Sequence, residues 1–250
     1  MKFGPVCSGD ALLFTALTGA RAAQARSLEV VASFTVLADV VRQVGGSHVH
    51  VTSLVPPNGD PHEFEPSPDD ARCIRDADVT FVSGEGLESW FSRLVVASGY
   101  RGTPVIASNG IKTLLLRENG HMVTDPHVWN SIPNVEIWVA NIRNALSAAD
   151  PDDAADFRAQ AESYTRELET LDRETEARFS AIPRARRIVL TSHDALGYFG
   201  DRYGVTFVSP IGVSTETEAS AADVAQVIRQ IRAEHVKTYF FENSNDARLV

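Results

Sequence analysis

The chain has 250 residues, of which 44% are hydrophobic, and a formal net charge of −10 at pH 7. This length and hydrophobic share allow one large globular domain or two modest ones, each with a buried core. The negative charge argues against nucleic acid as a partner, because nucleic-acid binding requires a basic surface. It is compatible with attraction of cations, although simple solubility is the more ordinary explanation.

The first 25 residues have the features of a secretory signal peptide. A positive charge at Lys2 is followed by an apolar stretch over 11–17 and then by the small-x-small sequence Ala23-Gln24-Ala25. The apolar stretch is too short to span a bilayer. We therefore predict cleavage after Ala25 and export of the remaining chain.

The residues after the signal peptide alternate between strand-like and helix-like segments. Apolar and β-branched runs predict strands, whereas caps, prolines and turn residues mark the ends of helices. In chain order we expect strand 28–34, helix 36–44, strand 49–55, a helix from 67 or 69 to 76, strand 79–83, helix 87–98, strand 104–107 and a loop over 116–126. Cys73 is expected to be a small buried hydrophobic residue on its helix.

A long helical pattern divides the chain. A helix over 134–148 is followed by a second helical pattern that opens at Pro151 and runs to about Ile182. This second segment is far longer than a mean helix of about 11–12 residues, and a helix that joins two lobes would explain it. Beyond Pro183 we expect strand 187–191, helix 195–203, strand 205–209, helix 221–234 and strand 237–242.

Repeated strand–helix units predict parallel sheets covered by helices. We therefore expect an α/β fold with two lobes of parallel sheet flanked by helices and joined by one long helix. The predicted divisions are a signal peptide over 1–25, an N-terminal lobe over 26–133, a helical region over 134–182 and a C-terminal lobe over 183–250. The second lobe offers about three strands where the first offers four, so we expect it to be truncated.

Three histidines lie in short, distinctive sequences: His62 in DPHEFEPSP, His127 in DPHVW and His193 in TSHDA. Neutral imidazole is the commonest protein ligand for zinc and suits several other transition metals. Each histidine follows a predicted strand, on the side of the sheet where open α/β proteins bind ligands. We expect the cleft between the lobes to collect all three around one divalent metal ion.

Prolines and aspartates surround two of these histidines. Pro61 and Pro126 each precede a histidine and fix a backbone angle, which lowers the cost of ordering the loop. Asp60 and Asp125, or Asp194 beside the third histidine, are candidates to orient an imidazole through its second nitrogen.

The remaining histidines have ordinary explanations. His48 and His50 are expected in solvent at a strand edge, and His235 at the end of a helix, where a cation is favourable. His121 lies in a polar loop, where an accessory metal contact stays open.

The chain resembles the metal-specific solute-binding proteins of bacterial ABC importers for zinc and manganese, the helix-bridged class, over about 28–250. The most specific matching sequences are PHEFEPSP at 61–68, DPHVW at 125–129 and SHDALGYF at 192–199; STETEAS at 214–220 also resembles the family, with Ala219 where a proline is usual. The resemblance implies that His62, His127 and His193 are metal ligands. It also implies a fourth ligand, a carboxylate near the C-terminus, that would lie beyond Val250.

The same resemblance implies a periplasmic, monomeric protein that delivers its metal ion to the membrane permease of an ABC transporter. Family members with histidine at the position of His193 tend to take zinc, whereas those with glutamate there tend to take manganese. Nitrogen-rich sites suit Zn²⁺ and oxygen-rich sites suit Mn²⁺. We therefore expect Zn²⁺ as the bound cargo, with Mn²⁺ as the alternative. The histidine-rich loop of many zinc members is missing, since the loop over 116–126 has only His121.

Two further functions stay open on the sequence. Three histidines with one free position are also the pattern of catalytic zinc, so a zinc hydrolase is an alternative. The chain has no His-Glu-x-x-His motif that would supply a general base. A surface adhesin, as reported for some relatives, is required by none of these residues. We expect a binding protein without enzymatic activity.

Overall fold

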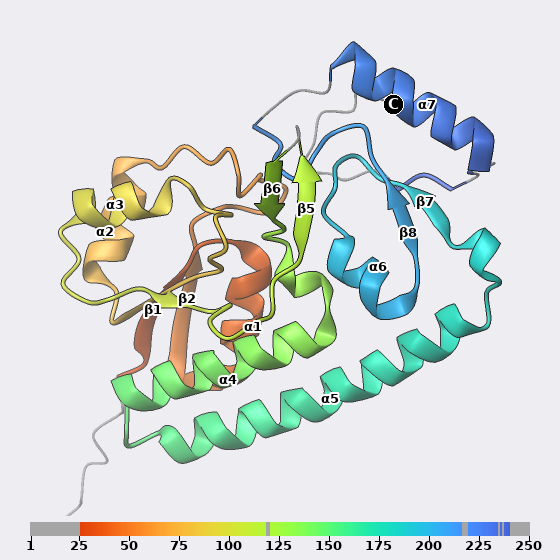
Figure 1. Ribbon diagram of the computed structural model, residues 1–250. Helices are drawn as coiled ribbons and strands as arrows, with labels where there is room; N and C mark the ends of the chain where they lie inside the picture. Colours follow the sequence, from red (N-terminus) through yellow and green to blue (C-terminus); the bar gives the residue numbers. More distant parts are fainter. Residues whose placement is uncertain (1–25, 119–120, 217–219, 235, 237, 241–250) are drawn as a thin grey trace, which may run out of the picture.

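The computed structural model describes residues 26–118, 121–216, 220–234, 236 and 238–240. The predicted signal peptide, His235 and residues 217–219 lie outside the described residues. Figure 1 shows two lobes side by side, with one long helix running beneath both. Within the described ranges, no helix is both long enough and apolar enough to cross a membrane.

The N-terminal lobe is built on a parallel sheet of four strands in the order β2-β1-β3-β4. The strands are β1 (Leu28–Ala32), β2 (Val49–Ser53), β3 (Val79–Val82) and β4 (Val105–Ile106). Val30 of β1 lies opposite Val51 of β2 on one side and Val79 of β3 on the other. All of β3 is buried, as expected of a strand that is covered by helices on both faces.

Helices cover this sheet, and one of them begins with a side-chain cap. They are α1 (Thr35–Gly45), α2 (Pro68–Asp76), α3 (Phe91–Ser98) and α4 (Ile132–Ala149), with short 3-10 turns at Gly46–His48 and Val128–Asn130. Ser67 and Asp70 form a reciprocal capping box at the start of α2, with Pro68 in the first turn. Cys73 is exposed on α2, so the prediction of a buried cysteine was wrong.

Two predicted segments differ from the structure in this lobe. The helix expected from residue 87 begins at Phe91, because Gly84, Glu85 and Gly86 have positive φ angles and a turn precedes it. The loop expected over 116–126 contains an antiparallel hairpin of β5 (Leu115–Glu118) and β6 (His121–Thr124). The sequence between these strands is Asn-Gly, the strongest short signal for a hairpin, which the prediction overlooked.

The long helix is α5 (Ala154–Ser180), which has 27 residues and is therefore about 40 Å long. A turn over 151–153 separates it from α4. The helix therefore begins three residues later than predicted. Phe157, Ala161 and Leu168 of α5 share one hydrophobic core with α4 and the N-terminal sheet. The boundaries expected at 133 and 182 stay predictions.

The C-terminal lobe repeats the strand–helix pattern on a smaller scale. A 3-10 turn at Arg184–Arg186 leads into β7 (Ile188–Leu190), which pairs in parallel with β8 (Thr206–Val208). The helices are α6 (Gly197–Tyr203) and α7 (Ala221–Glu234). Leu190 also pairs in parallel with Tyr239, where a further strand was predicted over 237–242. The α/β fold of two helix-flanked parallel sheets joined by one long helix is confirmed.

Candidate metal centre

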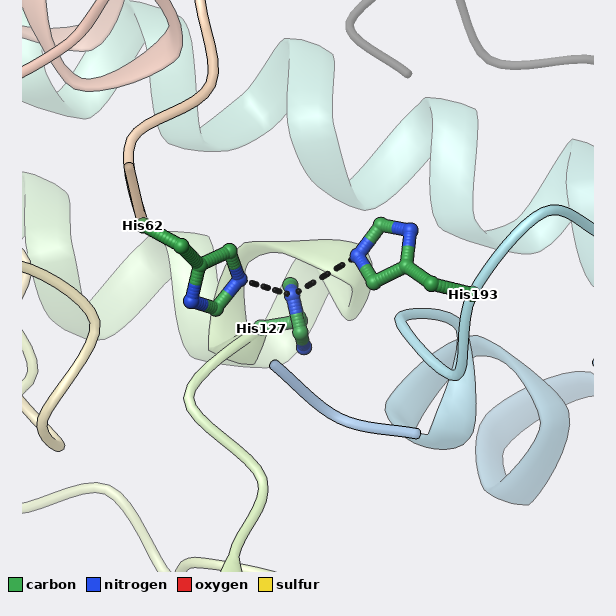
Figure 2. Close-up of side chains that lie close together, drawn as sticks. All are labelled: His62, His127 and His193. Atoms are coloured by element: carbon green, nitrogen blue, oxygen red, sulfur yellow. Dashed lines mark hydrogen bonds between the residues drawn. The ribbon is translucent and has the colours of Figure 1, made fainter. Parts of the chain in front are cut away.

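The structure brings His62, His127 and His193 together between the two lobes (Figure 2). His62 comes from the loop between β2 and α2, His127 from the segment after β6, and His193 from the segment after β7. Their exposed fractions are 7%, 2% and 6%, so all three side chains are buried. The predicted gathering of three histidines from both lobes is what the fold produces.

The three imidazoles meet through the same ring atom. Nε2 of His127 lies 3.1 Å from Nε2 of His62 and 3.3 Å from Nε2 of His193. A tetrahedral zinc ion with bonds of about 2.0–2.1 Å to nitrogen keeps its ligand atoms about 3.3 Å apart. The spacing of the nitrogens therefore fits a single ion of that size.

Asp125 fixes the orientation of His127. Its buried carboxylate Oδ1 accepts hydrogen bonds from Nδ1–H of His127, at 2.9 Å, and from the backbone N–H of the same residue, at 3.0 Å. This hydrogen bond keeps the imidazole proton on Nδ1. The lone pair of Nε2 is therefore free to face the other histidines. Of the aspartates predicted to orient an imidazole, Asp125 makes that contact; for Asp194 the role stays a prediction.

The segment that carries Asp125 is itself held by the C-terminal lobe. The hydroxyl of Tyr198 on α6 donates to the backbone oxygen of Asp125 at 2.9 Å and accepts from the N–H of Leu114 at 3.0 Å. A Cβ added to Gly197 would lie 2.6 Å from Oδ2 of Asp125. A side chain larger than that of glycine would therefore force α6 or this carboxylate to shift.

His62 is positioned through its backbone. Oδ1 of Asp60 accepts the N–H of His62 at 2.8 Å, which closes a tight turn, and Nε1–H of Trp90 donates to the oxygen of Pro61 at 2.8 Å. Burial, together with the neighbouring His127, lowers the pKa of His62 to about 4. The imidazole is thus neutral at physiological pH, as a metal ligand must be.

Sequence reasoning missed Trp90 and its neighbour Glu88. The buried carboxylate of Glu88 accepts hydrogen bonds from Ser33 Oγ at 2.6 Å and from the N–H groups of Ser83, at 2.8 Å, and Gly84, at 3.1 Å. Burial raises the pKa of Glu88, and these three donors oppose that rise. Glu88 thereby ties the loop that carries Trp90 to the ends of β1 and β3. An acid and a tryptophan in the turn between a buried strand and the next helix were the available signal.

His193 is held by backbone contacts in the C-terminal lobe. Its carbonyl oxygen accepts from Thr191 Oγ1 and from the N–H of Ala195, each at 3.1 Å. It also forms a parallel bridge with Ile211, and Asn130 of the N-terminal lobe donates to the oxygen of Ala195 at 2.8 Å. The third histidine therefore sits at a point where both lobes contact one another.

A second group of possible ligands lies at the far end of the N-terminal lobe. Nδ1 of His48 is 2.7 Å from Asp153, and Nε2 is 3.1 Å from Asp156. The His48 side chain is 26% exposed, so the expectation that it lies in solvent was wrong, whereas His50 is exposed and pairs with Glu29. The two ring nitrogens face different carboxylates, which is the arrangement of an ion pair and not of ligands aimed at one ion.

Among the described residues, the remaining histidine is His121, which is exposed on β6 and is not among the histidines that come together. Within the described part of the chain, the buried group contains three imidazoles and no carboxylate oxygen.

Two α/β lobes joined by a long helix, with three buried histidines between them, define the class of metal-binding solute-binding proteins of ABC importers. The chain belongs to the ZnuA family, described as zinc-uptake complex component A, periplasmic, which it matches over residues 30–250. The family consists of solute-binding proteins and not of enzymes, so the zinc hydrolase alternative is excluded.

Similar proteins agree on the class and differ in the metal they are named for. The chain is 33% identical over 234 residues to the manganese ABC transporter substrate-binding lipoprotein PsaA of Streptococcus mitis, covering 91% of this chain and 76% of that one. It is 32% identical over 240 residues to the iron ABC transporter substrate-binding lipoprotein MtsA of Streptococcus pyogenes serotype M1, covering 92% and 77%. The solved structure of the periplasmic zinc-binding protein TroA from Treponema pallidum matches with a TM-score of 0.81 and 28% identity, covering 88% of this chain and 79% of that one.

These findings establish the function at the level of class. The chain is an extracytoplasmic substrate-binding protein that binds a metal ion and works with the membrane permease of an ABC importer. The relatives are named for manganese, iron and zinc, so the metal has to be argued from this chain's own residues.

Proposed function

We propose that the chain captures Zn²⁺ through His62, His127 and His193 and delivers it to the permease. The observation that supports zinc is the donor set: three imidazole nitrogens with Nε2 separations of 3.1 and 3.3 Å. Imidazole suits zinc, whereas manganese favours carboxylate, carbonyl and water oxygens. The fourth ligand that the resemblance implies, a carboxylate beyond Val250, stays a prediction.

A manganese cargo is the second candidate, supported by the relatives that are named for manganese. The two candidates differ in a measurable way. Zn²⁺ and Mn²⁺ would be titrated in parallel into the metal-free chain against a chromophoric chelator. A tight one-to-one zinc site with weak manganese binding is expected, and tighter binding of manganese would contradict the proposed cargo.

The ligand roles are tested by removing each imidazole in turn. His62→Ala, His127→Ala and His193→Ala should each weaken zinc binding by orders of magnitude without unfolding the protein, because each side chain supplies one of few metal bonds. His50→Ala is the matched control, since His50 is exposed and pairs with Glu29. A variant with unchanged zinc affinity would remove that residue from the site.

Release of the ion would follow from loosening a ligand loop when the protein docks on the permease. Arg202 on α6 donates from Nε to Asp172 on α5 at 3.1 Å, and the hydroxyl of Tyr203 donates to the same carboxylate at 2.7 Å. The C-terminal lobe is thus tied to the long helix, which limits the relative motion of the lobes. We also propose that the protein acts as a monomer, which light scattering on a sizing column would test.

A further inference from the structure

One carboxylate joins a ligand loop in the N-terminal lobe to the C-terminal lobe. Oδ1 of Asp60 accepts the backbone N–H of His62 at 2.8 Å. Oδ2 of the same side chain accepts the hydroxyl of Thr215 at 2.7 Å, across a separation of 155 residues. The two oxygens of Asp60 therefore hold a candidate metal ligand and a segment of the other lobe at the same time.

The segment that carries Thr215 makes a second contact with the N-terminal lobe. Oγ of Ser89 donates to Glu216 at 3.2 Å, and the N–H of Glu216 donates to Oγ of Ser214 at 3.2 Å. Ser89 is one residue before Trp90, whose ring nitrogen holds Pro61 beside His62. Residues 214–216 thus lie against both supports of the His62 loop.

We propose that the Asp60–Thr215 contact couples the closed arrangement of the lobes to the position of His62 and slows release of the metal ion. The inference rests on the proposed function for its metal and adds two positioning residues to that site. Asp60 acts on the backbone of His62, and Thr215 acts through Asp60.

The coupling follows from the geometry of a single rigid group. A hydrogen bond to an ionised carboxylate is stronger than one between neutral groups, so the hydroxyl of Thr215 restricts how the Asp60 side chain can turn. When the lobes separate at this point, Oδ2 loses its donor and the Asp60 side chain gains freedom to rotate. The turn that presents His62 then loosens. By linkage, a metal ion that fixes His62 in turn favours the contact.

Thr215→Val is the most selective test, because it removes the hydroxyl and keeps the shape of the side chain. We expect zinc to leave this variant about 3- to 10-fold faster than the wild type, measured by transfer to an excess of chelator, as expected for the net contribution of one half-buried hydrogen bond. Thr215→Ser, which keeps the hydroxyl, should restore the wild-type rate. Thr170→Val on the exposed surface of α5 is the matched control and should release zinc at the wild-type rate.

A double-mutant cycle separates the contact from a general loss of stability. Asp60→Asn keeps an oxygen for the N–H of His62 and replaces the oxygen that accepts from Thr215. Thr215→Val should accelerate release in the wild-type background and add little in the Asp60→Asn background. Equal acceleration in both backgrounds, or a Thr215→Ser variant as fast as Thr215→Val, would overturn the proposal.

Hydrogen exchange on the metal-free protein tests the same contact without zinc. Backbone amides over 58–66 should exchange faster in Thr215→Val than in the wild type or in Thr215→Ser, while amides of β3 stay unchanged. If the amides over 58–66 exchanged at the wild-type rate in Thr215→Val, the proposed coupling would be overturned. A wild-type chain that bound no zinc would overturn the proposed function instead, and the exchange result would still decide the Asp60–Thr215 contact.

Discussion

The N-terminal lobe carries two of the three histidines, His62 after β2 and His127 after β6, whereas the C-terminal lobe carries one. Every residue of β3 is buried, but all three residues of β7, which leads to His193, are only partly buried. His127 is oriented by a buried carboxylate of its own lobe. His193 is held by backbone contacts to neighbouring segments.

This difference indicates that the two lobes contribute to the site in different ways. The N-terminal lobe supports both of its histidines with its own side chains: Trp90 holds the backbone beside His62, and Asp125 orients His127. The C-terminal lobe adds the third nitrogen, and its position depends on contacts with the N-terminal lobe and α5. Changes in metal binding that leave the fold intact should therefore be easiest to produce at the contacts between the lobes.

The strongest test of the comparison is a matched pair of core substitutions. Val30 on β1 is 1% exposed and Val208 on β8 is 5% exposed. We expect Val30→Ala to lower the free energy of unfolding by about 2–3 kcal/mol and Val208→Ala by about 1–2 kcal/mol, because the smaller lobe can relax around the cavity. Urea unfolding of the metal-free proteins would measure both, and equal losses would contradict the difference in packing.

Asp125→Asn tests the support of His127. The amide keeps the size of the carboxylate but loses its negative charge, so the imidazole is less well oriented and a poorer donor to the metal. Zinc affinity should fall about 10- to 100-fold, the usual effect of removing the hydrogen-bond partner of a metal-bound histidine. Chelator competition would measure it, with Asp194→Asn beside His193 as the comparison in the other lobe.

The pH dependence of stability tests the environment of His62. Its pKa is lowered from 6.5 to about 4 in the folded protein, so between these values the unfolded chain binds a proton that the folded chain does not. Stability of the metal-free protein should therefore fall as pH drops from about 7 towards 4, by about 3 kcal/mol from this group. Thermal unfolding across this range should show a shallower slope for His62→Gln than for the wild type. An identical slope would assign the effect to other groups.

Gly197→Ala should produce the smallest change, and it acts from the C-terminal lobe on a residue of the N-terminal lobe. The added methyl would lie 2.6 Å from Oδ2 of Asp125, so α6 or the carboxylate must shift. A shift of a few tenths of an ångström at Asp125 would turn the ring of His127, and zinc binding should weaken about 2- to 5-fold. Gly99→Ala, where a Cβ meets no atom within 4 Å, is a control for zinc affinity, although its left-handed backbone adds strain. Equal zinc affinities in the two variants would show that Asp125 tolerates the approach.

The convergence of His62 and His193 could be predicted because it depends on topology. His62 and His193 follow β2 and β7 of parallel sheets, and loops at the carboxyl ends of such strands face the ligand crevice. His127 instead follows the antiparallel β5–β6 hairpin, so this rule does not explain its place. The Asp-Pro-His pattern likewise pointed to Asp125, two residues from the imidazole that it orients. These features need only the order of strands and helices and a short local motif.

Contacts made by side chains between distant segments could not be predicted. Nothing in the periodicity of either segment links Asp60 to Thr215 or His48 to Asp153, since each pair meets only after the lobes and α5 have packed. The exposure of Cys73 depends on which face of α2 points outward, and α2 buries only Ile74. The β5–β6 hairpin, by contrast, had a readable signal in its Asn-Gly sequence.

The attachment of α5 at both ends affects how metal-free and metal-loaded molecules compete for the permease. Its first turns are held by His48 and by the burial of Phe157. Its last turns are held by Asp172 and by stacking of Phe179 on Tyr203 of α6. A straight helix with two fixed ends resists bending, so the empty and loaded forms should have nearly the same outline. We expect empty molecules to occupy the permease and to slow uptake when they outnumber loaded ones. Adding metal-free protein to a transport assay at constant loaded protein would reveal this competition as a falling rate.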